Sequence, residues 1–284
     1  DPRILLYGEG WDMGTGLRPE DKAKKDNAYQ LPRIGFFNDT ERDAVKGAEV
    51  YGGIKAGFVS GQATEDIVAK SILGSSELGS YLSPDQVLNY VEAHDNFNLH
   101  DLLAELHPDD DILTRTKRIE LATAMNLLMQ GMSFMEVGQE FSRTKLVATG
   151  EDGQVLHSDR ERAMNSYNAP DIVNQVNWDI LQDHQESIDF IKNIIRLKTS
   201  CKAFSYQTYE DIYKHVFVQS AEQGSGLIIF EIKDDKHYQV IFNASGLPYY
   251  LPNADKLRLI VGNSRHKKPF YVENLTVSVF EVIQ

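Results

Sequence analysis

Cysteine is almost absent from this sequence of 284 residues. Cys201 is the only one, so an internal disulfide framework and a metal site made of several cysteines are both excluded. Cys201 follows an amphipathic stretch, and we expect it to serve as a packing residue.

Long apolar runs are absent as well. No stretch approaches the roughly 20 consecutive apolar residues of a transmembrane helix, so we expect no membrane insertion. The first residues do not have the basic segment and apolar segment of a signal peptide, and there is no initiator Met. We therefore expect this chain to be a fragment of a longer protein.

Basic residues are in deficit. Lys and Arg number 29 against 42 for Asp and Glu, which gives a net charge of −13. Because basic surfaces supply most of the affinity for phosphate backbones, this balance argues against a nucleic-acid partner and against an anionic membrane surface. The 42% hydrophobic and 25% charged fractions are ordinary for a soluble globular protein with a sizeable core.

Short apolar runs alternate with helical patterns up to about residue 200, which is typical of βα units. The strands that this pattern predicts are Arg3–Tyr7, Ile34–Phe37, Val87–Ala93 and Ser133–Val137. The helices that it predicts are Glu65–Leu73, Ile112–Met129 and Ser187–Lys198.

Local signals refine these helices. Thr64 is a plausible N-cap for the first of them. The acidic residues Asp109–Asp111 precede the second, where they complement the helix dipole more plausibly than they bind calcium. In the third helix, Ile188, Ile191 and Ile195 are expected to share one face.

The pattern changes near Phe204, after which only strands are predicted. The expected strands are Leu227–Ile232, Tyr238–Asn243, Leu257–Val261 and Leu275–Ile283, the first two joined as a hairpin through Lys233–His237. Residues 205–284 are therefore predicted to form a small antiparallel β-domain. The glycine-rich segment Tyr51–Gly57 lacks the spacing of a phosphate-binding loop, and we expect a surface loop there.

Two acidic residues follow predicted strands. Glu9 comes after the first strand and Asp95 after the third. In a (β/α)8 barrel the catalytic groups lie at the carboxyl ends of strands, and a pair of carboxyl groups at that position suits glycoside hydrolysis. From position alone, solvated loop residues are the more common alternative.

Five segments follow one another within residues 1–180, namely Tyr7–Asp12 (YGEGWD), Ile34–Asp39 with Arg42–Gly47 (IGFFND, RDAVKG), Tyr90–Asn96 (YVEAHDN), Met135–Phe141 with Arg143–Lys145 (MEVGQEF, RTK), and Asn165–Asn168 with Asp171 and Asn174–Trp178 (NSYN, NQVNW). In this order they resemble the pullulanase group of the α-amylase superfamily.

This resemblance implies an α/β fold, with strands 5 to 8 of a (β/α)8 TIM barrel followed by a small antiparallel β-sandwich. Residues 1–204 would form the second half of the barrel, and residues 205–284 the sandwich. The implied activity is that of a retaining glycoside hydrolase that cleaves α-1,6-glucosidic branch linkages in pullulan, starch or glycogen-type α-glucans.

The resemblance also assigns roles to residues. Glu9 would be the general acid/base, and Asp95 would stabilise the oxocarbenium-like transition state. The implied substrate-binding residues are Trp11, His94, Asn96, Tyr167, Asn168, Asp171 and Gln175. Gln175 departs from the family, in which an arginine is frequent at this place. A buried tryptophan, a rim histidine and ordinary loop packing remain the alternatives for Trp11, His94 and the pair Tyr167 and Asn168.

One element of the family's chemistry has no counterpart in the sequence. The nucleophilic Asp of the family belongs to strand 4, before the strand that carries Glu9. A retaining mechanism needs that second carboxyl group, so we expect the chain alone to be inactive. Its expected partners are an α-glucan and the N-terminal half of the same enzyme.

Two alternatives to a pullulanase stay open: an isoamylase-like or other debranching enzyme, and a non-catalytic glycan-binding module. The resemblance implies no cofactor and no metal among these residues, with a structural calcium ion conceivable in the full-length enzyme. It implies an extracellular or cell-surface location in a bacterium.

Overall fold

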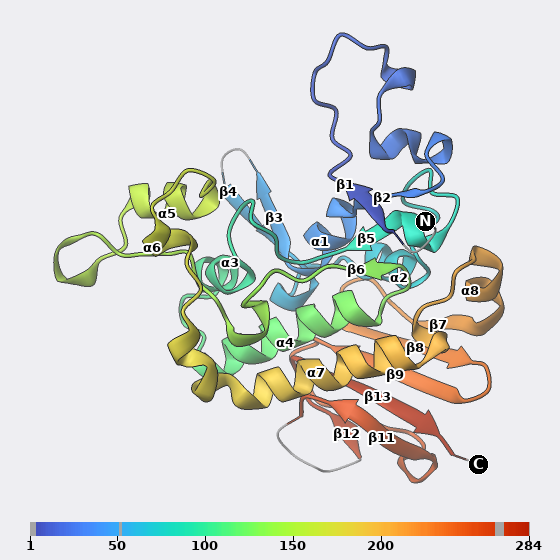
Figure 1. Cartoon of the computed structure of the whole chain (residues 1–284). Helices are drawn as coiled ribbons and strands as arrows, with labels where there is room; N and C mark the ends of the chain where they lie inside the picture. The colour runs from blue at the N-terminus through green and yellow to red at the C-terminus, as the bar shows by residue number, and fades with distance from the viewer. Residues whose placement is uncertain (1–3, 51–52, 265–269, 284) are drawn as a thin grey trace.

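The computed structural model describes residues 4–50, 53–264 and 270–283 (Figure 1). Its first layer is a four-stranded sheet in the order β1-β2-β5-β6, in which all neighbours are parallel. The strands are β1 (Leu6–Gly8), β2 (Ile34–Phe37), β5 (Val87–Asn89) and β6 (Met132–Ser133). The parallel pairing of β1 with β2 confirms the predicted parallel sheet, but only 3-10 turns, Pro19–Asp21 and Lys25–Gln30, lie between these two strands.

Two of these strands are shorter than the sequence predicts. β5 ends at Asn89 rather than Ala93, because the Tyr90 amide donates to the Glu41 carboxylate (3.1 Å) instead of to a neighbouring strand. β6 ends at Ser133, and the Phe134 amide makes the last bond, to the Asn89 carbonyl (2.8 Å). Arg3, which was assigned to the first strand, lies outside the described residues.

β1 forms an edge of this sheet and is poorly covered. Leu6 and Tyr7 are 56% and 53% exposed, and the preceding Leu5 is 68% exposed. Apolar side chains of a parallel strand are normally buried on both faces. Within the described residues, nothing shields this strand to the same degree as β2 and β5.

The helices follow the strands. They are α1 (Asp39–Val45), α2 (Glu65–Ile72), α3 (Leu99–Leu106), α4 (Ile112–Leu128), α5 (His157–Met164), α6 (Asp171–Asn174), α7 (Gln185–Ser200) and α8 (Tyr209–His215). Asp111 caps α4 by accepting from the Thr114 amide (2.7 Å), as expected for an acid before a helix. Thr64 does not cap α2, because its hydroxyl donates to the Ala44 carbonyl instead (2.7 Å).

The second layer is a five-stranded antiparallel sheet in the order β11-β13-β9-β8-β7. Its strands are β7 (Val216–Ser220), β8 (Leu227–Lys233), β9 (His237–Asn243), β11 (Leu257–Gly262) and β13 (Thr276–Val282), and a short ladder joins β10 (Tyr249–Tyr250) to β12 (Tyr271–Val272). β8 and β9 form the predicted hairpin.

The glycine-rich segment is not wholly a surface loop. Gly53–Ala56 forms β4, which pairs antiparallel with β3 (Gly47–Val50). Gly47 has φ +112°, and a Cβ there would lie 2.1 Å from the Lys55 carbonyl oxygen. Only glycine fits this close approach of two backbones, so Gly47 permits the pairing of β3 with β4. Tyr51 and Gly52 lie outside the described residues.

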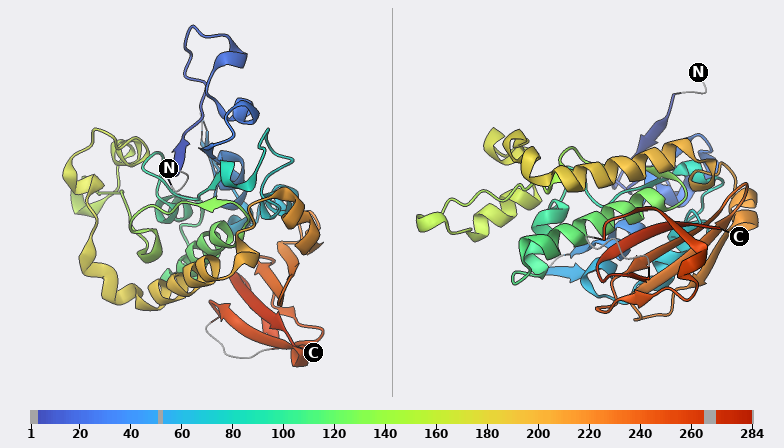
Figure 2. Two further views of the ribbon diagram at one scale, coloured as in Figure 1. Left: turned by 45° about the vertical axis from the view of Figure 1, so that its right-hand side comes forward. Right: turned by 90° about the horizontal axis from the view of Figure 1, so that it is seen from below.

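Two long helices, α4 and α7, lie side by side between the two sheets (Figures 1 and 2). One contiguous core runs from α4 and α7 into β8, β9 and β13. The buried residues of α7 are Ser187, Ile188, Phe190, Ile191 and Ile194, whereas Ile195 is 39% exposed. The predicted face was therefore wrong by one position at its C-terminal end. Cys201 packs against this core, as expected.

Glu120 is buried and connects the layers through hydrogen bonds. Its two carboxylate oxygens accept from Ser187 Oγ (2.6 Å) on α7 and from Asn263 Nδ2 (2.9 Å) after β11. Asn263 in turn accepts from the Val277 amide of β13 (2.8 Å). A buried carboxylate needs such partners, and these tie α4 to α7 and to the antiparallel sheet.

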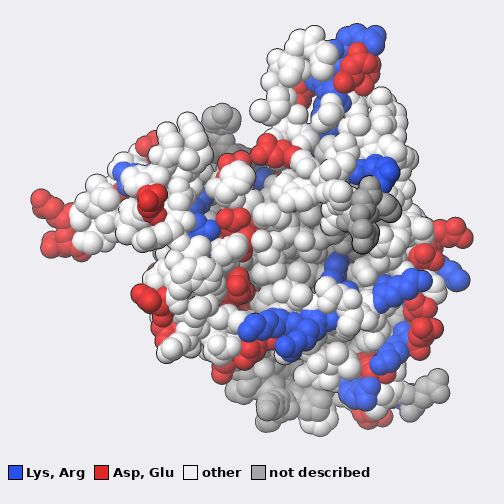
Figure 3. All heavy atoms as spheres, viewed as in Figure 1, with Lys and Arg blue, Asp and Glu red and all other residues white. Residues whose placement is uncertain are grey.

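On the face drawn in Figure 3, basic and acidic side chains are interspersed and no broad basic surface appears. Among the helices of the described residues, none combines the length and the apolar character needed to cross a membrane.

We expect Glu120→Ala to lower the free energy of unfolding by about 2–4 kcal/mol, because it leaves buried donors of Ser187 and Asn263 unsatisfied. Urea denaturation followed by circular dichroism measures this. The control is Glu222→Ala in the exposed turn after β7, which should change stability by less than about 0.5 kcal/mol. Equal stabilities of the two variants would contradict the role of Glu120.

Candidate active site

Glu9 follows directly on β1. The next residue, Gly10, has φ +71°, and a Cβ there would lie 2.5 Å from Phe36 Cδ1. A side chain at this position would clash and would also strain the backbone. Glycine therefore lets the chain turn sharply after Glu9 and bring Trp11 back toward the sheet.

The second group of residues follows β5. His94, Asp95 and Asn96 lie on the segment between the end of β5 and the start of α3. Asn96 has φ +65°, a left-handed conformation that asparagine tolerates better than most residues. Because β1 and β5 are parallel members of one sheet, their carboxyl ends open on the same edge.

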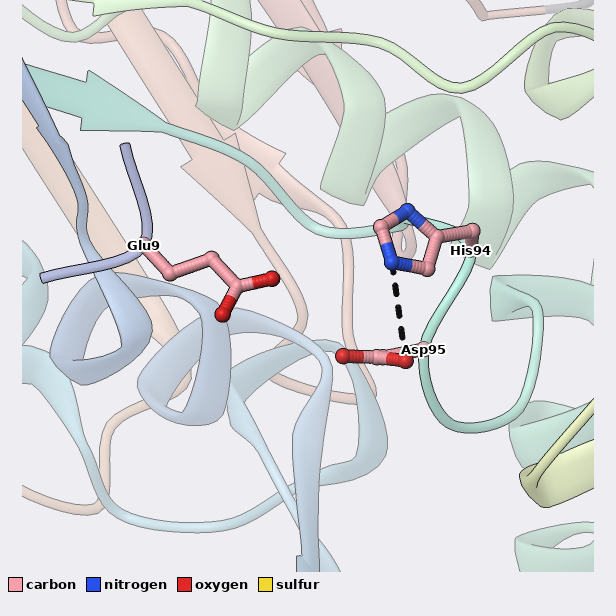
Figure 4. Close-up of side chains that lie close together, drawn as sticks. All are labelled: Glu9, His94 and Asp95. Carbon is pink, nitrogen blue, oxygen red and sulfur yellow. Dashed lines mark ion pairs between the residues drawn. The ribbon is translucent and has the colours of Figure 1, made fainter. Parts of the chain in front are cut away.

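The structure brings five predicted residues into one pocket of about 190 Å³. Its lining comprises Glu9, Trp11, Phe37, Arg42, Tyr90, Ala93, His94, Asp95 and Asn96. Ligand atoms of Glu9, His94 and Asp95 all lie within 4.8 Å of one another, and His94 Nε2 lies 3.6 Å from Asp95 Oδ1. Figure 4 shows the Glu9 and Asp95 carboxylates facing the same space. The carboxyl groups of Glu9 and Asp95 therefore share one cleft.

Aromatic rings form the floor of this pocket. The ring of Phe37 contacts those of Tyr90 and Tyr7 edge-on, with centroids 4.9 Å and 6.0 Å apart. Arg42 Nη1 donates to the Tyr90 hydroxyl (2.7 Å), and the guanidinium also pairs with Asp43. Burial raises the pKa of Tyr90 well above its ordinary value, so its hydroxyl stays protonated near neutral pH.

Trp11 is half-buried and lies in the pocket lining, but one face of its indole is covered. Lys25 Nζ lies 4.9 Å from the ring centroid, in cation–π contact. The same ammonium pairs with Asp39. Trp11 is therefore held in place by a neighbouring cation, and it is not the fully buried tryptophan of the alternative interpretation.

The four remaining predicted residues do not line this pocket. Tyr167, Asn168, Asp171 and Gln175 are all exposed and lie around the short helix α6. A wider cavity of about 1080 Å³ shares Asn96 with this pocket and is also lined by Met164 and Asn165, which precede this segment. The four residues themselves line neither cavity.

Glu9, His94 and Asp95 are also the set of side chains, within the described residues, whose ligand atoms could reach one metal ion. All three are exposed, and exposed carboxylates commonly occur without a metal. The expectation that no metal is used stays a prediction.

Buried ionisable groups lie behind the pocket. Glu41 is fully buried on α1, and desolvation raises the pKa of its carboxyl to about 8. Glu92 is likewise buried with its pKa raised to about 8, and accepts from the Leu99 amide (2.7 Å). Both carboxyls bind backbone amides beside the segment that carries His94 and Asp95.

Sequence reasoning missed several residues that build this site. Arg42, Tyr90 and Lys145 all lie inside the segments that carry the resemblance, yet no role was assigned to them. Lys145 is buried, and its ammonium donates to the backbone carbonyls of His94 (3.0 Å) and Asn96. Only the three-dimensional structure shows that a lysine fifty residues along the chain holds this loop.

No family model matches the chain. The pullulanase of Bacillus subtilis (strain 168) is 35% identical over 273 residues, covering 91% of this chain and 35% of that protein. The solved pullulanase of Anoxybacillus sp. LM18-11 in complex with maltotetraose superimposes with a TM-score of 0.85 at 32% identity, over 99% of this chain and 40% of that one. The predicted resemblance to pullulanases is confirmed.

A second solved structure agrees. Pullulanase type I from Bacillus subtilis, in complex with maltose, has a TM-score of 0.82 at 31% identity and covers all of this chain. The chain spans about two fifths of the length of these pullulanase structures and 35% of the curated relative.

Stability should fall as the pH rises through the range in which Glu41 titrates. The folded state keeps a proton on Glu41 up to about pH 8, whereas an unfolded chain releases it near the ordinary value of 4.5. Between these values the folded state binds more protons, so stability falls by up to roughly 1.4 kcal/mol per pH unit.

Denaturant titrations from pH 5 to 8 measure this slope. Glu41→Gln should make it shallower, because glutamine accepts from the Tyr90 amide without titrating, while Glu92 keeps a slope of the same sign. Glu161→Gln, at an exposed position of α5, should leave the slope as it is. An unchanged slope in Glu41→Gln would show that Glu41 is ionised in the folded protein.

Proposed function

We propose that this chain contributes the acid/base side of an active site that hydrolyses α-1,6-glucosidic branch linkages in α-glucans with retention. The observation that carries the proposal is the meeting of Glu9, His94 and Asp95 in one pocket at the carboxyl edge of a parallel sheet. The similarity to pullulanases, some of them solved with maltotetraose or maltotriose, supports an α-glucan as the ligand.

In this proposal Glu9 protonates the leaving oxygen and later activates water. Asp95 stabilises positive charge that develops on the sugar, and His94 hydrogen-bonds the sugar beside it. The acid role requires a carboxyl that holds its proton near neutral pH. Glu9 is exposed among the described residues, so further protein or the bound glucan must bury it before it can act.

We also propose that the parallel sheet is part of a (β/α)8 barrel, residues 1–204, and that residues 205–284 form a sandwich domain. Two observations support this. The site lies at the carboxyl ends of the strands, as in barrel enzymes, and β1 leaves apolar side chains exposed where further strands would pack.

The carboxylate nucleophile of the retaining reaction would come from a part of the enzyme outside these residues. A glucan would lie across the pocket and the wider cavity that share Asn96. Tyr167, Asn168, Asp171 and Gln175 would contact sugars further along that glucan.

In an enzyme that contains the complete barrel, Glu9→Gln should lower kcat for pullulan by about 10³-fold, because general acid catalysis is lost. The loss should be smaller for α-glucosyl fluoride, whose leaving group needs no proton. KM should change little, since the amide is nearly isosteric. Glu20→Gln, an exposed residue of a 3-10 turn, is the matched control. A reducing-sugar assay in which Glu9→Gln retains the wild-type rate would contradict the acid/base role.

The chain of 284 residues alone should bind maltotriose without hydrolysing pullulan, because no glycosyl-enzyme can form without a nucleophile. Calorimetry and a reducing-sugar assay test the two halves of this statement. Turnover by the chain alone would contradict the proposed division of the site. Binding by the chain, together with an inactive complete protein, would instead favour the glycan-binding module.

A further inference from the structure

The loop that carries His94, Asp95 and Asn96 has no strand or helix of its own. Its geometry is held from behind by Lys145, which is 2% exposed. Lys145 Nζ donates to the His94 carbonyl (3.0 Å) and to the Asn96 carbonyl. These bonds flank Asp95 on both sides and fix the left-handed backbone of Asn96.

The same ammonium reaches a second segment of the chain. Lys145 Nζ lies 3.3 Å from Ser166 Oγ, next to Tyr167 and Asn168. An ammonium has three donors, and these three oxygens can use all of them. One buried cation therefore bonds to both segments that carry predicted sugar-binding residues.

Lys145 is itself fixed at its backbone. Its amide donates to Asp101 Oδ2 (2.8 Å), and the neighbouring Thr144 hydroxyl bonds to the other oxygen of Asp101. Asp101 is buried in the first turn of α3. The backbone of Lys145 is thus bonded to helix α3, so its ammonium can impose a position on the two segments that it binds.

Arg143 supports the second segment from the other side. Its Nη2 donates to the Asn174 carbonyl (2.6 Å), and Asn174 Nδ2 donates to the Ser166 carbonyl (2.7 Å). The residues from 166 to 175 are in this way connected to the segment Arg143–Lys145 at both ends.

We propose that Lys145 is a positioning residue that couples the loop at 94–96 to the segment at 166–168, so that both present their sugar contacts in one fixed arrangement. The identity of the ligand rests on the proposed function, whereas the coupling rests on the contacts of Lys145 alone. Lys145 touches no sugar in this proposal and acts through the backbone of its neighbours.

The test compares Lys145→Met with wild type in the chain of 284 residues, because methionine keeps an apolar stem of similar length and removes the ammonium. Amide hydrogen exchange is read at Phe97, whose amide donates to Glu49 (3.1 Å), and at Ala169, whose amide donates to the Ser166 carbonyl (3.0 Å). Maltotriose affinity is measured in parallel by calorimetry.

Lys198→Met is the matched control. Lys198 is another lysine that donates to two backbone carbonyls, of Met129 (2.6 Å) and Gly131 (3.0 Å), but these lie at the end of α4 away from the pocket. It should cost comparable global stability while leaving exchange at Phe97 and Ala169 unchanged.

We expect Lys145→Met to speed exchange at both amides by about tenfold or more and to weaken maltotriose binding by about tenfold, equivalent to about 1.4 kcal/mol. Unchanged exchange at either amide, or the same change in Lys198→Met, would overturn the coupling. If the wild-type chain does not bind maltotriose, the proposed function is contradicted. The coupling is then judged from the hydrogen-exchange rates alone.

Ser166→Ala provides a second route if Lys145→Met does not fold. It removes only the hydroxyl that Lys145 reaches in the second segment. We expect faster exchange at Ala169 with Phe97 unaffected, because the bonds to the first loop remain. Exchange at Ala169 identical to that of wild type would refute the link.

Discussion

The site depends on a chain of buried side-chain amides beneath the carboxyl ends of the parallel strands. Asn38, just after β2, donates to Asn89 Oδ1 at the end of β5 (3.0 Å), and Asn89 donates to the Gln130 carbonyl (2.9 Å). The Gln130 side chain then bonds to Ala203 and Tyr206, ahead of α8 and the antiparallel sheet. All three amides are buried, so each lost partner would leave an unsatisfied polar group. These bonds align the carboxyl ends of β2 and β5, and Asp95 lies on the loop that follows β5.

This alignment explains how short strands can define a site. β5 and β6 each contribute only two paired positions to their neighbours, which is too little to fix the loops that follow. Beyond the strand ends, hydrogen bonds from side chains hold the loops in place. Glu41 and Glu92 accept from backbone amides, and Lys145 donates to backbone carbonyls. The loop at His94 is consequently held by buried carboxyl groups and a buried ammonium, and its surface is left free for a ligand.

The sequence predicted which residues meet in the pocket better than it predicted where elements end. Glu9, Trp11, His94, Asp95 and Asn96 were found because short segments of characteristic composition preserve their order along the chain. The ends of β5 and the missing cap of α2 depend on Glu41 and Ala44, which are distant in sequence from the residues they bind. Ile195 was misplaced because helix periodicity alone cannot distinguish two adjacent positions at the edge of a buried face. The role of Lys145 could not be inferred from the sequence, because a lysine in a polar segment is normally expected at the surface.

The Lys25 ammonium over Trp11 limits how a carbohydrate can stack on the indole. A sugar that stacks on the face of the indole covered by Lys25 must displace the ammonium from the ring. Asp39 already pairs with that ammonium and can retain it once the ring is uncovered. The Lys25 side chain therefore covers one face of the indole. Moving it away breaks its contact with the ring and keeps its ion pair with Asp39. The environment of the indole would change at that moment, which makes Trp11 a built-in optical reporter of occupancy.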